Sequence, residues 1–193
     1  TPIIGVDWKL GKLNLAAKYE FRTKINLENE SKNSANVDAM MPAYADGAKV
    51  RSDIPAILTL GAEVEALKNL RVAAGFHYYW DKDAKGTPIN EGDNTWEANF
   101  GVEGDVTNKL TLSFGLQTTN YGFEDADMKD TNFNINSNAL LFGGAYKFNE
   151  HFKLNVGYMH SFYSSHDFVN ANGTACNYTR ENDVVGVSLD MKF

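Results

Sequence analysis

Apolar and polar residues alternate with a period of two along most of this 193-residue chain. Near the end, Val185, Val187, Leu189 and Met191 alternate with small or polar residues as far as Phe193. A period of two places apolar side chains on one face of a β-strand and polar side chains on the other. The pattern therefore predicts an all-β protein whose strands each have one apolar face.

The same alternation predicts nine strands. They span residues 3–10, 13–28, 54–65, 70–81, 95–106, 109–119, 134–148, 152–163 and 183–193. The connections after the first, third, fifth and seventh strands are only about two to four residues long. Those after the second, fourth, sixth and eighth strands are much longer, spanning residues 29–53, 82–94, 120–133 and 164–182.

Short turns at one end and long loops at the other are typical of outer-membrane β-barrels, where the turns face the periplasm and the loops face outward. Aromatic residues near both strand ends fit the girdles that such barrels place at the membrane surfaces. An aromatic last residue is typical of their closing strand, so we expect Phe193 to be read by the barrel assembly machinery. We predict an antiparallel transmembrane β-barrel of the bacterial outer membrane, in contact with lipid and lipopolysaccharide.

An odd number of strands cannot close into an antiparallel barrel, because the first and ninth strands would run in the same direction. The chain also begins at Thr1-Pro2, with neither an initiator methionine nor a signal peptide. We therefore expect residues 1–193 to form a single barrel region, the C-terminal part of a larger barrel whose upstream strands are absent.

Two segments carry a resemblance to a known family. They read RSDIPAILTLG at residues 51–61 and LRVAAGFHYYW at residues 70–80. They resemble the C-terminal half of the outer-membrane transporters of hydrophobic compounds (the FadL/OmpP1/TodX family), and the loops resemble the Bacteroides-type version. The resemblance implies a barrel of about 14 strands with an N-terminal hatch. It also implies passive uptake of hydrophobic solutes such as long-chain fatty acids.

Composition excludes several other classes of protein. The net charge of −7 argues against a nucleic-acid partner, which requires a basic surface. Cys176 is the only cysteine, and no catalytic or metal-binding motif is present, so we expect neither enzyme activity, nor a cofactor, nor a metal. An acidic cluster at residues 124–130 would allow weak cation bridging to lipopolysaccharide, although a solvated loop is the favoured interpretation.

Apolar side chains interrupt the polar, lumen-facing side of the predicted strands. The alternation points these residues inward: Ile57, Tyr79, Leu141, Met159 and Tyr163. Such an apolar patch would hold an acyl chain, and inward Arg22, Lys24 and Arg71 would bind a carboxylate head group. The alternative is that these side chains fill the lumen and pair with Glu20, Glu63, Glu97 and Glu103.

Two further classes of protein stay open. A related branch serves type IX secretion as a shuttle (PorV-like), and the loop at 29–53, with Met40, Met41 and Tyr44, would suit such docking. A soluble β-sandwich or lipocalin-like binding protein is the other class. It requires a second sheet to cover the apolar face of Leu110, Leu112, Phe114 and Leu116.

Overall fold

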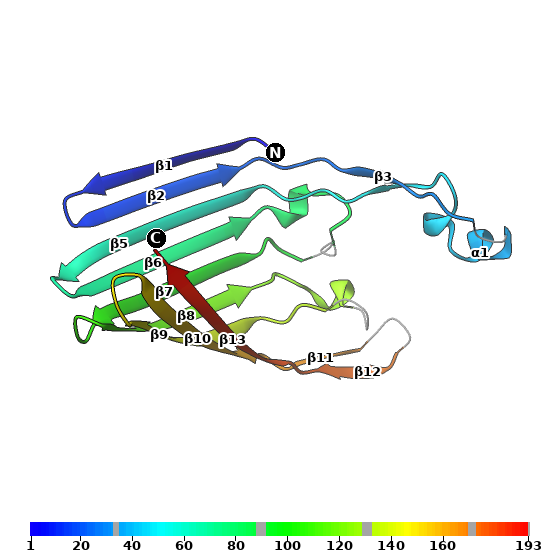
Figure 1. Ribbon diagram of the computed structural model, residues 1–193. Helices are drawn as coiled ribbons and strands as arrows, with labels where there is room; N and C mark the ends of the chain where they lie inside the picture. Colours follow the sequence, from blue (N-terminus) through cyan, green and yellow to red (C-terminus); the bar gives the residue numbers. More distant parts are fainter. Residues whose placement is uncertain (33–34, 88–91, 129–132, 170–172, 193) are drawn as a thin grey trace.

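The computed structural model describes residues 1–32, 35–87, 92–128, 133–169 and 173–192. Its main feature is an antiparallel sheet of nine strands in the order β1-β2-β5-β6-β7-β8-β9-β10-β13 (Figure 1). The strands are β1 (Ile3–Leu10), β2 (Leu13–Glu20), β5 (Ile57–Leu67), β6 (Leu70–Tyr79), β7 (Trp96–Asp105), β8 (Leu110–Asn120), β9 (Ser137–Lys147), β10 (Phe152–Tyr163) and β13 (Glu181–Met191). The predicted nine-stranded, all-β, antiparallel fold is confirmed.

All short turns lie at one end of the sheet and all long loops at the other (Figure 1). Each strand pairs with the strand before it in the sheet order, so β1 and β13 are the two edges and run in the same direction. The last residue, Phe193, lies outside the described residues, and its recognition by the assembly machinery stays a prediction.

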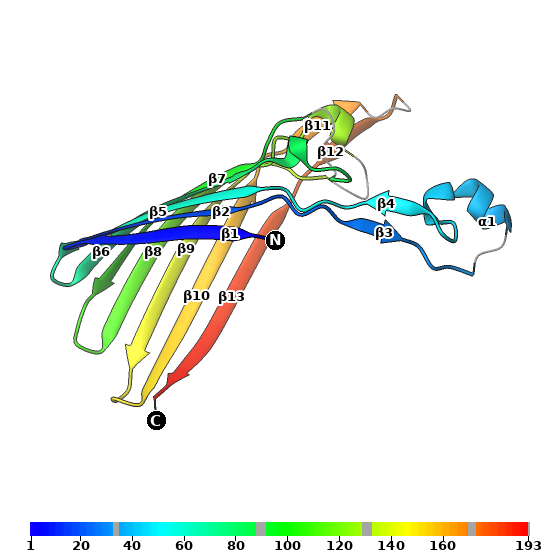
Figure 2. The same cartoon turned by 90° about the horizontal axis from the view of Figure 1, so that it is seen from above.

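The sheet is strongly curved, and the direction of its strands changes progressively from β1 to β13 (Figure 2). One groove touches strands from β5 to β13, so the face that lines it is concave. Large apolar side chains on the convex face are exposed to the surroundings. Examples are Phe100 (46 %), Leu112 (48 %) and Val187 (68 %). In the described part of the chain no second sheet covers this face, so the soluble β-sandwich has no support.

Aromatic rings gather on the convex face where the long loops begin. Tyr19 and Tyr78 both contact the Trp80 ring edge-on, with ring centroids 5.6 and 4.9 Å apart, and Phe76 stacks on Trp96. At the short-turn end, Tyr146 and Phe148 form a second edge-to-face pair, 5.1 Å apart. Aromatic residues near both ends of the strands fit the girdles that outer-membrane barrels place at the two membrane surfaces.

The prediction of one continuous strand over residues 13–28 is wrong after Glu20. The segment opposite it contains Pro55, which has no N–H to donate to a ladder. In addition, the Ile25 N–H donates to the Asp53 carboxylate (3.2 Å) instead of to a strand. The chain makes one isolated bridge, Thr23 to Ile54, and then a separate ribbon of β3 (Asn26–Glu28) and β4 (Lys49–Arg51).

The long loops contain structure that the alternation did not predict. Between β3 and β4 lie a short helix, α1 (Ala35–Met40), and a 3-10 turn, η1 (Pro42–Tyr44). With the ribbon they form an arm (residues 26–32 and 35–51) that projects beyond the sheet (Figures 1 and 2). The loop after β10 holds a second hairpin, β11 (His166–Val169) with β12 (Ala175–Tyr178), and two further 3-10 turns are η2 (Asp81–Asp83) and η3 (Asp125–Asp127). Among the described residues, no helix is both long and apolar enough to span a membrane.

Candidate functional site

A groove of about 560 Å³ runs over the middle of the concave face. Its walls carry the side chains of Ala73, Leu141, Met159 and Val184, and charged side chains border the end nearer the short turns. Volumes of 300–1,000 Å³ with apolar walls and few polar groups are typical of sites for small hydrophobic molecules. The groove is therefore the strongest candidate for a ligand site in the described structure.

Glycines form the floor of this groove. The strand register places Gly101 opposite Gly115, and Gly143 opposite Gly157, which itself lies opposite Gly186. These residues alternate with the exposed apolar residues of the convex face, so they all belong to the concave face. Because glycine has no side chain, these positions leave free space on the concave face beside the apolar side chains that line the groove. The alternation of apolar and polar residues did not predict this floor, although glycine at repeated inward positions was the signal that pointed to it.

The five predicted apolar lumen residues lie at two levels. Leu141 and Met159 are register partners on β9 and β10, and both line the groove. Ile57 and Tyr79 are register partners at the long-loop end of β5 and β6. Tyr163 ends β10 at that same end, and the guanidinium of Arg180 lies 5.0 Å from the centre of its ring. The structure thus brings Leu141 and Met159 together in the groove and leaves the other three at the long-loop end of the concave face.

A polar network lies on the concave face between the groove and the long loops, and it is centred on the Glu97 carboxylate. Oε2 accepts a hydrogen bond from the Tyr79 hydroxyl (3.0 Å) and lies 3.2 Å from Nδ1 of His77. Oε1 accepts from the Thr119 hydroxyl (3.1 Å) and from the Gln117 amide (3.5 Å). Glu97 therefore ties β6, β7 and β8 together across the concave face, and its acceptor sites are engaged by protein donors.

Arg71, one of the predicted head-group partners, is already engaged by carboxylates. Its Nε donates to Oε1 of Glu103 (2.9 Å), and its Nη1 lies 3.5 Å from Oδ2 of Asp105. Asp105 in turn accepts from the Thr111 hydroxyl (2.7 Å). This arrangement matches the alternative in which the inward charges pair among themselves.

Arg22 and Lys24 do not lie on a strand of the main sheet, because β2 ends at Glu20. Arg22 donates from Nη1 to the carbonyl oxygen of Asp83, and Lys24 is exposed. The two cations therefore do not reach the lumen from β2, and their role as head-group partners stays a prediction. The cause is the same interruption of β2 that forms the separate ribbon.

The long loops are fastened to one another by buried or half-buried carboxylates. Asp53 accepts from Arg51 (2.6 Å) and from the backbone N–H of Ile25 and Lys85, so it joins the first two long loops. The hydrogen bond from Arg51 lowers the pKa of the Asp53 carboxyl to about 2. We call the contacts between Arg51, Asp53, Lys85 and Gly86 the rim junction. Gly86 belongs to it because its backbone has a φ of +77° and lies against the carbonyl of Arg51.

Two further carboxylates continue these connections around the rim. The buried Asp127 accepts from the Gly92 N–H (2.9 Å) and so joins the second loop to the third. His166 of β11 lies 2.8 Å from Asp125 of η3, which joins the third loop to the fourth. The acidic residues at 124–127 thus hold the loops together, and Asp130 lies outside the described residues. The described part of the chain contains no group of three or more side chains suited to a metal ion.

No protein-family model and no curated protein matches this sequence. Solved structures do match the fold. A FadL homologue of Pseudomonas aeruginosa has a TM-score of 0.70 at 16 % identity, over 97 % of this chain and 50 % of its own. The toluene transporter TodX of P. putida gives 0.60 at 18 % identity, over 98 % and 48 %. The toluene transporter TbuX of Ralstonia pickettii gives 0.56 at 12 % identity, over 98 % and 46 %.

The chain therefore spans about half the length of the proteins that it matches. The resemblance drawn from residues 51–61 and 70–80 is confirmed at the level of the fold, while the Bacteroides-type assignment stays a prediction. The nine strands have the fold of about half of a FadL-type outer-membrane β-barrel.

Proposed function

We propose that the protein containing this chain carries hydrophobic solutes passively across the outer membrane, and that the concave groove is part of their path. The observation that supports this proposal most strongly is the apolar groove with a glycine floor on the face opposite the lipid-facing one. A wall whose role was only structural would gain stability from filling that space, because close packing is favourable. Long-chain fatty acids belong to this solute class, as do the compounds named for TodX and TbuX.

The groove can be filled without disturbing the sheet. A Cβ atom at Gly186 would meet no atom within 4 Å, and one at Gly157 would meet only the Phe142 carbonyl at 4.0 Å. Gly157→Leu and Gly186→Leu should therefore fold normally and narrow the groove. We expect each variant to reduce uptake of a labelled hydrophobic solute several-fold, in cells that express the complete protein.

Gly144→Leu is the matched control, because Gly144 lies on the convex face, where a Cβ would meet Leu112 at 3.5 Å and the Thr111 carbonyl oxygen at 3.9 Å. Correct assembly of all variants is checked by the shift of the folded band on heating. If uptake through both groove variants equals that through the parent protein and the Gly144→Leu control, the groove is not part of the path and the proposal fails.

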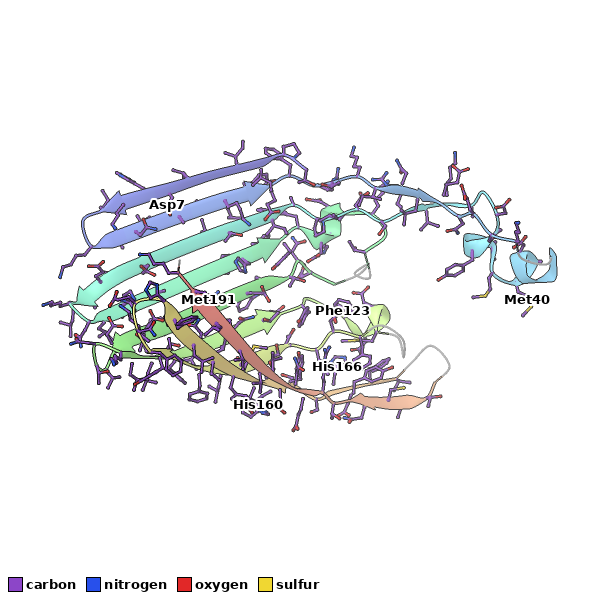
Figure 3. All side chains as sticks on the ribbon, viewed as in Figure 1. Asp7, Met40, Phe123, His160, His166 and Met191 are labelled. Atoms are coloured by element: carbon purple, nitrogen blue, oxygen red, sulfur yellow. The ribbon has the colours of Figure 1, made fainter. Side chains whose placement is uncertain are left out.

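A shuttle or interaction role is the second candidate, and one observation favours it. The tip of the arm exposes Met40 (83 %), Met41 (52 %) and Tyr44 (63 %). Figure 3 shows Met40 well apart from Phe123 and His166, which belong to the other loops. Flexible methionines with an aromatic residue are frequent at binding surfaces. Replacing all three by serine should abolish co-purification of a secreted partner and leave solute uptake intact. Unchanged co-purification would contradict the shuttle role.

A further inference from the structure

Several basic side chains on the concave face are already held by carboxylates. Lys18 lies 2.7 Å from Glu20, and Lys153 lies 3.2 Å from Asp190. Lys147 lies 3.1 Å from Glu150 at the adjoining turn, and Arg71 is shared between Glu103 and Asp105. Within the described residues, three lysines of this face form no such contact: Lys9 at the end of β1, Lys109 just before β8 and Lys192 just after β13. All three lie at the short-turn end and none lines the groove.

Carboxylate side chains on the same face outnumber the basic side chains that could neutralise them. Glu63 lines the groove, its side chain is exposed, and within the described residues it forms no ion pair. Among the described residues, Glu97 contacts one side chain that can become positively charged, His77, and three neutral donors. A solute that crosses the groove therefore meets carboxylates before and after its apolar part. Among the described residues that line the groove, the one cation is Arg71, which is already paired with Glu103 and Asp105.

The physical consequence concerns the charge of the solute. Channels lined by Asp and Glu disfavour anions, because like charges in a narrow, low-dielectric passage repel. An ionised carboxylate would also lose its hydration in the apolar groove without gaining a partner. Resting on the proposed uptake function, we infer that this wall selects uncharged hydrophobic solutes over carboxylates of the same chain length. Glu63 is the residue of the groove that sets this preference most directly.

The test compares two probes with the same chain, 1-dodecanol and dodecanoate, at pH 7.5. Uptake of each labelled probe is measured in cells that express the complete protein and is corrected for cells without it. The parent protein should raise uptake of the alcohol more than that of the carboxylate. A unit charge about 7 Å away in water changes an anion's occupancy roughly threefold. Glu63→Gln should therefore raise the carboxylate-to-alcohol ratio about threefold, and Glu63→Lys about tenfold.

Glu181→Lys is the matched control. Glu181 begins β13 on the convex face, opposite Phe162, so the substitution changes the net charge equally without facing the groove. The control should leave the ratio unchanged.

The outcomes separate this inference from the proposed function. If neither probe enters faster than in cells without the protein, the uptake function itself fails. If both enter equally and the ratio stays constant in Glu63→Gln and Glu63→Lys, the uptake function stands and the charge preference is overturned. If Glu181→Lys moves the ratio as much as Glu63→Lys does, the effect comes from overall charge, and the role of Glu63 is overturned.

Discussion

The nine-stranded wall and the long-loop rim of this molecule are stabilised in different ways. In the wall, strands of eight to twelve residues follow a regular register, and most of the large apolar side chains point away from the concave face. In the rim, the regular elements are three to six residues long, yet most of the buried side chains lie there. These include Met128, Ile135, Phe168 and Asp127.

The difference shows what each region needs from its sequence. A wall that faces lipid on one side and a lumen on the other needs only the correct residue class at each alternate position, with every backbone group paired. The rim has only short regular elements, so single side chains must fasten it. Asp53, Asp127 and the stacked rings of Phe133 and Tyr178, 4.3 Å apart, do this. The effect of a substitution on stability should therefore depend, in the wall, mainly on which face the residue occupies. In the rim it should depend on the contacts of that particular residue.

The largest effect should come from placing a charge on the lipid-facing side of the wall. Phe100 and Asn99 are neighbours on β7 at the same depth, on opposite faces. Phe100→Arg should destabilise the barrel by about 2–4 kcal/mol, whereas Asn99→Arg on the lumen side should cost less than about 1 kcal/mol. Unfolding in denaturant from lipid vesicles measures both. Equal losses would mean that the two faces do not differ in environment.

A smaller and local effect is expected in the rim at Gly86. A Cβ there would lie 1.8 Å from the carbonyl oxygen of Arg51, and the φ of +77° adds about 1–2 kcal/mol for any L side chain. Gly47 has a similar φ of +72° but free space around it, so Gly47→Ala should incur only the backbone cost. Trypsin cleavage after Arg51 should accelerate much more in Gly86→Ala than in Gly47→Ala. Similar rates would contradict the close contact at the rim junction.

The smallest effect should be a pH dependence confined to the rim junction. The pKa of the Asp53 carboxyl is lowered from 3.8 to about 2, chiefly by the hydrogen bond from Arg51. Because the folded value is the lower one, the stabilisation is complete above about pH 4 and is lost as the pH falls through 2.

Amide hydrogen exchange can follow this change at Ile25 and Lys85, whose N–H groups donate to Asp53. Protection factors should fall between pH 4 and 2, while those of β8 stay constant. In Asp53→Asn they should be low already at pH 5 and independent of pH. Constant protection of the two amides down to pH 2 would be incompatible with this role of Asp53.

Much of the wall could be predicted from the sequence, because the alternation of apolar and polar residues that defines each strand involves only neighbouring positions in the chain. The bounds of β1 and β10 agree with the alternation, and the inward side of Leu141 and Met159 follows from counting. The end of β2 could not be predicted in this way, since Thr23, Ile25 and Leu27 keep the period of two. The interruption depends on Pro55 and Asp53, which lie about thirty residues further along the chain.

The candidate site shows the same limit. The faces of the lumen residues were predicted, but the pairing of Arg71 with Glu103 depends on the register of two strands, which the pattern does not give. The hairpin β11–β12 was missed because strands of four residues are too short to show a period. The groove was missed because glycine carries no hydropathy signal, even where its absent side chain forms the cavity.

The most direct test of this account asks whether adjacent residues of one strand face different environments. Single cysteines at Asn99 and Phe100, in a background with Cys176→Ser, can each carry a spin label in the complete protein in lipid vesicles. The label at 99 should respond to a water-soluble relaxing agent, and the label at 100 to oxygen dissolved in the lipid. Equal responses at the two positions would contradict a barrel wall with a lipid-facing and a lumen-facing side.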